Sequence, residues 1–531
     1  EGGAVIKYDR GASLTITGGI EDRTSTYLPI TFTAKDDDSI GEIIKGSTGK
    51  PQNYYAATAL NLHNYQSDLR NLRIFYADQA ILYSGITNVP TFVDSIMYYS
   101  LQIWNSQFIN CGHGIVSEGG SITLRNILMY NVRTNFQNSL NKVNIGVEHL
   151  TVNQSDKLID GNDITLNITN SLIVNAADSS GITESNVVVV VNGNDIFLTV
   201  GAAGHYLADN SPYRNIGSTN IHARLKDEFR LRTTFPPKVV SSMKIEKTTE
   251  FSSQVERDND IPDLGYHYAA LDYVVSECLI TNANVKIKPG TAIGVFGDYG
   301  IGVSGTATID CQGAPENMNQ IVSYNLVQEQ LNAKWIGTSK LVAAPLNPKS
   351  EKARIYFRFT DFSLSARRGW HLYGFSRATQ PIIMKDCQFH NGYIYSARPS
   401  LQFTNCLFER VYFALDGWGI PMDTALWNNT FYGGIFEYDS TESGKWNIHN
   451  NVFDDTTIIN YGKTSNLIHS CNAYLNSCAT NNNRLLPASP NDVIVSRFGF
   501  LKGPLGRYYS GTNSPLLNAG SLANAGDIGL Y

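Results

Sequence analysis

The stretch "SLQFTNCLFERVYFAL" (residues 400–415) alternates apolar and polar residues, breaks at an Asn-Cys pair and then resumes. Alternation with a period of two predicts a β-strand with one buried face. The same register recurs along the chain: an Asn or Asp, a small or polar residue, any residue, and then an apolar residue that is usually Phe. Its leading residue stands at positions 105, 126, 170, 386, 405, 428 and 450, with a degenerate copy at His149.

Neighbouring copies within each series are 19 to 23 residues apart. That interval is too short for a strand–helix–strand unit, and it fits one coil of a right-handed parallel β-helix. Coils of such a solenoid stack at roughly 4.8 Å, so equivalent positions lie above one another. We therefore expect a core row of Phe389, Phe408, Phe431 and Phe453. An asparagine ladder at the bends is expected from Asn105, Asn126, Asn170, Asn405, Asn428 and Asn450.

A longer period underlies the first. The pairs 105/386, 126/405, 149/428 and 170/450 are offset by 281, 279, 279 and 280 residues. The closing stretches "NSPYRNIG" (210–217) and "NSPLLNAG" (513–520) also match each other. These offsets predict an all-β protein of two tandem homologous β-helix blocks, residues 1–268 and 269–531, with a charged insertion in the first block at about 222–260.

These motifs resemble the parallel β-helix repeat proteins of the pectate-lyase-like superfold. The ending "NSPLLNAG…DIGLY" is similar to the terminal coil of many secreted bacterial β-helix proteins. The stretch "FTAKDDDSIGEIIKGSTGKP" resembles duplicated units of large, repetitive secreted bacterial proteins. The resemblance implies an extracellular or cell-surface location, a polysaccharide or other glycan as partner, and further domains of a longer chain. It leaves function open, because this architecture hosts lyases, hydrolases, adhesins and stalks.

Charge and hydropathy exclude two classes of partner. The formal net charge is −6, with 41 basic and 47 acidic side chains mixed along the chain, so no basic stripe is available for nucleic acid. No run of about 18 apolar residues is present, and we expect no membrane insertion. Cys471 and Cys478 are close enough in sequence to form a disulfide in an oxidising compartment, or they are two ordinary thiols.

Ionisable residues gather on one outward column of the second block. The residue after each core Phe points outward, which gives His390, Glu409, Tyr432 and Asp454 on successive coils. The neighbouring column contains Arg410. Two carboxyl groups on such a column are sufficient for acid–base chemistry, with Glu409 and Asp454 as acid and base and with His390 or Arg410 stabilising charge. The alternative is an ordinary solvated face.

Aromatic residues near this column suit stacking on sugar rings. The candidate substrate-binding residues are Trp370, Tyr373, Trp418, Tyr432, Tyr438 and Asp455. We expect no cofactor and no zinc. Calcium remains open, because Asp36, Asp37 and Asp38, or Asp258, Asp260 and Asp263, carry suitable carboxylates without a complete calcium-loop pattern.

Two functional hypotheses follow. The first is a secreted or cell-surface β-helix module with a structural or adhesive role that contacts glycans. The second is a polysaccharide hydrolase or lyase that acts on the outer face of the second block.

Overall fold

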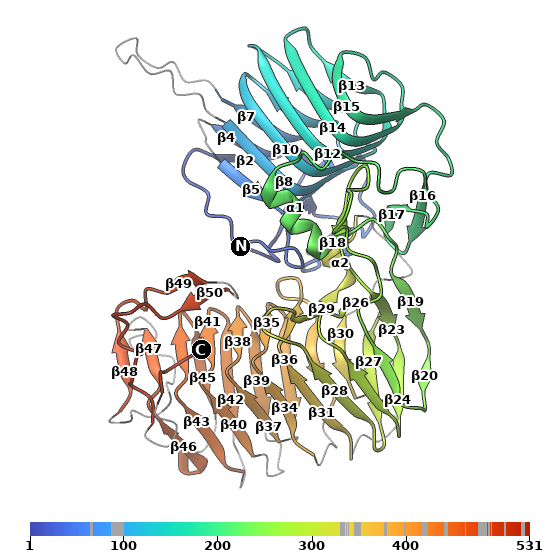
Figure 1. Cartoon of the computed structure of the whole chain (residues 1–531). Coiled ribbons are helices and arrows are strands. Elements are labelled where there is room, and N and C mark those ends of the chain that lie inside the picture. The colour runs from blue at the N-terminus through green and yellow to red at the C-terminus, as the bar shows by residue number, and fades with distance from the viewer. Residues whose placement is uncertain are drawn as a thin grey trace. The chain divides into compact units, whose positions relative to one another are not determined.

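The chain divides into two compact units, each described here by itself (Figure 1). The structure is a computed structural model. It describes residues 1–63, 67–85, 100–329, 335, 337, 339–344, 352–375, 380–397, 400–416, 423–439, 444–461, 464–475, 486, 489, 491–503, 506–521 and 526–530. Unit 1 comprises Glu1–Pro237, Val255–Ala270 and Asn325–Ala333, and unit 2 comprises Lys238–Gln254, Leu271–Tyr324 and Lys334–Tyr531.

Unit 2 is built around three parallel sheets. From β19 to β46 each coil contributes one strand to each sheet, and β47 and β48 extend the first sheet alone. Sheet 1 contains β19 (Lys238–Ser241), β23 (Tyr273–Ser276), β26 (Ala292–Val295), β29 (Asn319–Ser323), β32 (Thr360–Ser363), β35 (Gln388–His390), β38 (Leu407–Glu409), β41 (Thr430–Tyr432), β44 (Val452–Asp454), β47 (Ala473–Leu475) and β48 (Val493–Val495). Sheet 2 contains β20 (Lys244–Ile245), β24 (Cys278–Thr281), β27 (Tyr299–Ser304), β30 (Lys340–Ala343), β33 (Trp370–Tyr373), β36 (Tyr393–Ala397), β39 (Tyr412–Asp416), β42 (Ile435–Asp439) and β45 (Thr457–Asn460). Sheet 3 contains β21 (Thr249–Phe251), β25 (Asn284–Ile287), β28 (Thr308–Gln312), β31 (Arg354–Arg358), β34 (Ile382–Lys385), β37 (Leu401–Thr404), β40 (Thr424–Trp427), β43 (Trp446–His449) and β46 (Leu467–Ser470).

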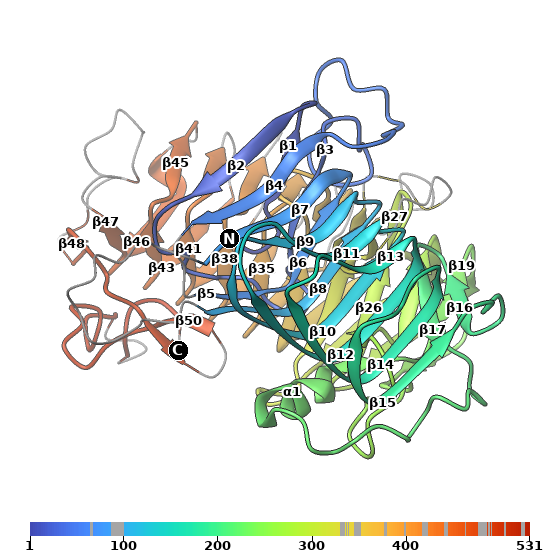
Figure 2. The ribbon, with the colours of Figure 1, turned by 90° about the horizontal axis from the view of Figure 1, so that it is seen from above.

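Unit 1 is built from two parallel sheets (Figure 2). The larger contains β1 (Val5–Tyr8), β3 (Ile30–Ala34), β5 (Ser67–Arg70), β6 (Leu72–Phe75), β8 (Ser100–Ile109), β10 (Gly120–Tyr130), β12 (Val143–Ser155), β14 (Ile164–Ala176) and β15 (Ile182–Val190). The smaller contains β2 (Ala12–Ile16), β4 (Ala56–His63), β7 (Ala77–Ser84), β9 (His113–Ser117), β11 (Thr134–Asn138) and β13 (Lys157–Asp160). Parallel strands in both units fit a β-helix type of fold, as the sequence predicts. The direction of winding and the homology of blocks 1–268 and 269–531 stay predictions.

Shorter elements connect or flank the sheets. Two antiparallel pairs lie in unit 1, and one antiparallel hairpin lies near the C-terminal end of unit 2. The bounds are β16 (Phe197–Val200), β17 (Ala203–Leu207), α1 (Ala223–Glu228), η1 (Phe229–Leu231), β18 (Arg232–Thr233), β22 (Tyr268–Ala269), α2 (Tyr324–Val327), η2 (Thr464–Asn466), β49 (Leu501–Gly503) and β50 (Gly506–Tyr509).

The expected row of phenylalanines forms the core of unit 2. Phe389 stacks on Phe408 with ring centroids 5.1 Å apart, Phe408 on Phe431 at 4.6 Å, and Phe431 on Phe453 at 5.0 Å. The row continues to Phe362 and Tyr474 at its two ends. Because parallel strands in register place equivalent side chains one above the other, the repeated Phe becomes a continuous aromatic stack. The prediction of this row is confirmed.

The repeated Asn or Asp occupies a corner of each coil with a left-handed backbone. The φ angles are 58° at Asn126, 57° at Asn405 and 55° at Asn428, a region that Asn adopts more readily than most residues. Asn126 Nδ2 donates to Asn105 Oδ1 at 2.9 Å, and Asn405 Nδ2 donates to Asp386 Oδ1 at 2.7 Å. The ladder is therefore real at these rungs.

Asparagines also stack at a position that the sequence analysis missed. Asn429 and Asn451 directly follow the corner residues and are fully buried. Asn429 Nδ2 donates to Asn451 Oδ1 at 2.9 Å, and Asn451 Nδ2 donates to Asn472 Oδ1 at 3.1 Å. These amides also satisfy carbonyl groups of neighbouring coils, such as Phe403 O and Leu426 O, so they close the polar backbone inside the corner.

The charged stretch 222–260 is only partly an excursion. Its first part forms α1 and η1 in unit 1. Its second part forms β19, β20 and β21, which pair in parallel with β23, β24 and β25. Residues 238–254 thus make the first coil of unit 2. In this part of the stretch the structure has a coil where the sequence predicts an insertion, because charged side chains on outward strand positions are compatible with a stacked coil.

Candidate functional site

The predicted column of outward side chains exists in sheet 1. His390 on β35 is in register with Glu409 on β38, which is in register with Tyr432 on β41 and then with Asp454 on β44. Ser363 on β32 precedes His390 in the same row. The structure therefore brings these predicted residues onto neighbouring rungs, while their catalytic roles stay predictions.

Glu409 is enclosed by three hydrogen-bond partners. Its Oε2 lies 2.6 Å from His390 Nδ1, and its Oε1 accepts hydrogen bonds from Arg410 Nη1 at 3.1 Å and from the Tyr508 hydroxyl at 2.8 Å. His390 and Glu409 are each only 8% exposed. His390 and Glu409, which the sequence predicts to face outward, are thus covered, because the C-terminal hairpin of β49 and β50 brings Tyr508 over them.

A further carboxylate completes this charged cluster. Asp361 Oδ1 on β32 lies 3.5 Å from His390 Nε2, so the imidazole lies between the carboxylates of Asp361 and Glu409. Ser363 Oγ donates to Asp361 Oδ1 at 3.2 Å. We name Asp361, His390, Glu409, Arg410 and Tyr508 the covered cluster.

The partners of Glu409 decide its ionisation. Burial by itself would raise the pKa of Glu409, but the hydrogen bond from His390 and the charges of His390 and Arg410 lower that pKa to about 2. Burial by itself would lower the pKa of His390, whereas the charge of Asp361 and the hydrogen bond to Glu409 raise it. Glu409 is therefore an anion at neutral pH and carries no proton to donate.

Arg410 does not point outward from a strand. Its φ is 54°, and Asn391 and Asp455 at the equivalent positions have φ of 57° and 49°. The column of Arg410, which the sequence predicts beside the column of Glu409, is therefore a left-handed corner between sheets 1 and 2. Arg410 bends back along this corner, and its Nε donates to Asn391 Oδ1 at 3.2 Å.

Asp454 differs from Glu409 in its surroundings. It is half-buried, and burial together with the charge of the exposed neighbour Asp455 raises the pKa of Asp454 to about 6. Tyr432 separates Asp454 from Glu409 in the row, and its ring lies 5.1 Å from that of Tyr508. Of the two carboxyl groups in the predicted column, Asp454 is therefore the one that can take up a proton near neutral pH.

The predicted aromatic residues fall into three groups. Trp370 and Tyr373 are half-buried on β33 of sheet 2, with ring centroids 5.3 Å apart. Tyr438 was wrongly predicted to contact sugar: it is fully buried and packs edge-on against Trp446 at 4.4 Å, because it alternates inward on β42. Trp418 lies outside the described residues.

Two members of the covered cluster escaped the sequence analysis. Asp361 belongs to the coil "FTDFSLS", in which Phe359 replaces the usual Asn at the left-handed corner with φ of 47°. Aligning Phe362 with Phe389 would have revealed that coil and placed Asp361 beside the column. Tyr508 lies outside the repeat, 99 positions from Glu409, and no periodic signal points to it.

The predicted calcium residues have other partners. Asp37 accepts hydrogen bonds from Thr33 and Ser39, and Asp258 lies against His267 while accepting the Asp263 backbone N–H. Within the part of the chain that the structure describes, no group of three or more His, Cys, Asp or Glu side chains is placed to hold a metal ion. Cys471 is buried, and its expected pairing lies outside the description because Cys478 does.

Comparisons with known proteins assign no family to the chain. No protein-family model and no curated protein matches the sequence. Among solved structures, it is similar to a PL6 family alginate lyase, AlyGC, with a TM-score of 0.21, 11% sequence identity, and coverage of 89% of this chain and 81% of that one. A likeness at that TM-score carries no argument about the site, so the fold assignment stands on the parallel sheets.

Among the described residues, no helix combines the length and the apolar character needed to cross a bilayer.

Proposed function

We propose that this chain is a secreted or cell-surface parallel β-helix module that contacts glycans without cleaving them. The observation that carries the proposal is a row of aromatic side chains on the outer face of sheet 2. Trp370, Tyr393 and Tyr412 occupy one register position on β33, β36 and β39. We name these three residues the aromatic row.

The aromatic row is ordered and reachable from solvent. The Trp370 and Tyr393 ring centroids are 5.8 Å apart, those of Tyr393 and Tyr412 are 5.5 Å apart, and all three side chains are half-buried. Nearby, Tyr395 is 38% exposed and Tyr461 is 58% exposed. Aromatic side chains combine a large apolar contact area with a polar edge, which matches the alternating CH and OH groups of a sugar ring.

Charged groups border the aromatic row on both sides. The Tyr412 hydroxyl donates a hydrogen bond to Glu437, and the Lys340 ammonium lies 4.5 Å from the centroid of the Tyr373 ring. A carboxylate and an ammonium can accept from and donate to sugar hydroxyls at fixed places along the row. Since consecutive coils rise by roughly 4.8 Å, an extended polysaccharide lying along the row meets one aromatic ring on each of three successive rungs.

The covered cluster supports contact rather than cleavage. Glu409 is 8% exposed, forms hydrogen bonds with His390, Arg410 and Tyr508, and has a pKa of about 2. A general acid must hold a proton at the working pH and must reach the leaving oxygen. Glu409 meets neither condition in this arrangement, so we assign it a role in holding the C-terminal hairpin against sheet 1.

A binding measurement on the full chain tests the proposal. We expect Trp370→Ala combined with Tyr412→Ala to weaken binding of soluble polysaccharides about tenfold or more in affinity electrophoresis and calorimetry. Tyr356→Ala is the matched control, because Tyr356 is a half-buried tyrosine on β31 of sheet 3. Absence of binding to any neutral or uronic polysaccharide, or equal loss in the control, would contradict the proposal.

A second candidate function is favoured by the different ionisation of two carboxyl groups in one row. Glu409 has a pKa of about 2 and Asp454 of about 6, a separation of the kind that divides base and acid roles in glycosidases. They are two strand spacings apart, which is roughly 10 Å. Under this hypothesis the chain is a polysaccharide hydrolase or lyase.

An activity assay separates the two functions. Neutral, fucosylated and uronic polysaccharides are incubated with the chain, and new reducing ends and the absorbance of an unsaturated product are measured. Turnover that Asp454→Asn abolishes would establish the enzyme and displace our first proposal. Saturable binding without turnover is the result that we expect.

A further inference from the structure

A pocket lies between the C-terminal hairpin and the corner at which sheets 3 and 1 meet. The empty space at this place, open solvent included, amounts to about 510 Å³. Its lining residues are Met318, Phe359, Asp386, Cys387, Gln388, Asn405, Leu407, Gly506, Arg507, Tyr508, Tyr509 and Leu530. All of them belong to unit 2.

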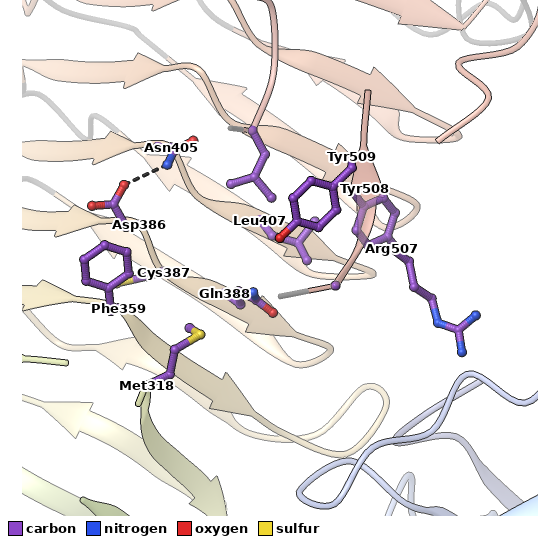
Figure 3. A pocket seen from close by; sticks show the side chains of 12 residues that line it. Met318, Phe359, Asp386, Cys387, Gln388, Asn405, Leu407, Arg507, Tyr508 and Tyr509 are labelled. Atoms are coloured by element: carbon purple, nitrogen blue, oxygen red, sulfur yellow. Dashed lines mark hydrogen bonds between the residues drawn. The ribbon is translucent and has the colours of Figure 1, made fainter. Parts of the chain in front are cut away.

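The walls of this pocket differ in chemistry (Figure 3). Asp386 and Asn405, from the asparagine ladder, stand on one side, and Tyr508 and Tyr509 of β50 stand on the other. Leu407 lies between the two walls. The pocket therefore presents an apolar, aromatic surface opposite a carboxylate and an amide.

Asp386 retains acceptor capacity toward the pocket. Its Oδ1 accepts a hydrogen bond from Asn405 Nδ2 at 2.7 Å and its Oδ2 accepts one from Arg358 Nε at 2.8 Å. A carboxylate offers about four acceptor sites, so these two bonds fix its orientation without saturating it. Hydrogen bonds from hydroxyl groups to an ionised carboxylate are stronger than neutral ones.

The charges at the pocket give an anion no evident advantage. Asp386 is already paired with the Arg358 guanidinium, and the Arg507 guanidinium points away from the other lining side chains (Figure 3). A uronic acid placed here would bring a second carboxylate toward Asp386. A neutral sugar instead matches its ring face to the Tyr509 wall and its hydroxyl groups to Asp386 and Asn405.

We infer that this pocket binds one uncharged sugar residue of a glycan, separately from the aromatic row. This inference rests on the proposed function, because it assumes that the chain contacts glycans. It assigns the asparagine ladder a binding role at the Asp386–Asn405 rung, in addition to its structural role elsewhere in unit 2. It also makes the C-terminal hairpin a wall of the site, because Tyr508 and Tyr509 come from β50.

Calorimetry on the full chain tests this assignment. The probes are neutral hexasaccharides of β-1,4-glucan, β-1,4-mannan and β-1,3-glucan, together with hexagalacturonate and hexamannuronate. We expect a neutral probe to bind more tightly than either uronate, and we expect Asp386→Asn and Tyr509→Ala each to weaken that binding about tenfold. Asp310→Asn is the matched control, because Asp310 is a half-buried aspartate on β28 of sheet 3.

Each result of these measurements either supports or overturns the proposed pocket. Thermal unfolding of every variant shows whether it folds, and Tyr509→Ala keeps the test valid if the Asp386 variant does not. Tighter binding of the uronates, or unchanged binding in both pocket variants, overturns the pocket. If binding is lost only in the Trp370 and Tyr412 double variant, the pocket falls while the proposed function stands. If no probe binds, both fall.

Discussion

Sheets 1 and 2 of unit 2 share the same coils, yet their outer faces differ. On sheet 1, His390 and Glu409 are 8% exposed beneath Tyr508 of the C-terminal hairpin. On sheet 2, three residues further along the same coils, Tyr393 and Tyr412 remain half-buried and open to solvent. The repeat therefore places a residue on a given face of the coil, whereas a segment outside the repeat decides whether that face is exposed to solvent.

Burying the charged side chains of sheet 1 costs free energy, because charges are removed from water. A buried carboxylate is tolerated when it is paired and hydrogen-bonded, and Glu409 has His390, Arg410 and Tyr508 around it. The rings of the aromatic row carry no charge and stay half-buried without such a cover. Sheet 1 therefore presents a covered, charged cluster and sheet 2 presents exposed aromatic surface, and the functions of both faces stay proposals.

The largest expected effect on stability concerns the core row, which lies inside the coils beneath both outer faces. Phe408 is 1% exposed and packs between Phe389 and Phe431 in the core row. We expect Phe408→Ala to lower the free energy of unfolding by about 4 kcal/mol, since it removes a large core side chain. Tyr412→Ala on the outer face of sheet 2 should cost about 1 kcal/mol or less. Urea unfolding followed by circular dichroism measures both, and equal losses would show that the core row is not the main support.

The covered cluster should show the next largest effect. We expect Glu409→Gln to cost about 3 kcal/mol at pH 7, because it removes the anion that faces His390 and Arg410. The folded pKa of about 2 lies below the ordinary value of 4.5, so this stability is present above pH 4.5 and is lost as pH falls toward 2.

Thermal unfolding across pH 2 to 7 checks that prediction. The parent and the Gln variant should converge at the acid end of the range. Glu437→Gln is the control, because Glu437 accepts a hydrogen bond from Tyr412 on the open face of sheet 2. A control that loses as much as Glu409→Gln would erase the distinction between the covered and the open face.

Asp454 should respond in the opposite direction. Burial and Asp455 raise the pKa of Asp454 from 3.8 to about 6, so its ionisation destabilises the folded chain as pH rises through that interval. We expect Asp454→Asn to raise the free energy of unfolding by about 2 kcal/mol at pH 7.5 and to leave it unchanged at pH 3. Denaturant titrations at the two pH values test this. A destabilised variant at pH 7.5 would mean that the carboxylate has partners that stabilise its charge.

The smallest effect concerns the contact that covers sheet 1. Tyr508→Phe removes the hydroxyl that donates to Glu409 Oε1 at 2.8 Å and keeps the ring against Tyr432. We expect a loss of about 1.5 kcal/mol, the lower end of the net contribution of a hydrogen bond to a charged group. Because that hydroxyl helps to lower the pKa of Glu409, the acid midpoint of unfolding should also rise slightly. An unchanged midpoint would show that the hairpin does not act on Glu409.

Much of unit 2 could be predicted from particular residues. The Phe389 to Phe453 row, the left-handed corners at Asn405 and Asn428, and the shared row of His390, Glu409 and Asp454 all follow from one repeating interval. The burial of Tyr438 was missed, because the sequence analysis grouped it with aromatic residues that contact sugar, whereas it lies on an inward position of β42. Asp361 was missed because its coil has Phe359 at the corner where the repeat usually has Asn or Asp.

By itself, the sequence determined the stacking of coils, because parallel strands in register bring residues one coil apart within a single strand spacing. The tertiary structure alone decided the state of the candidate site. Tyr508 reaches Glu409 across 99 positions that share no period with it. A contact of that kind depends on how the chain folds back after the last coil, and its consequences for burial and charge follow only from the folded arrangement.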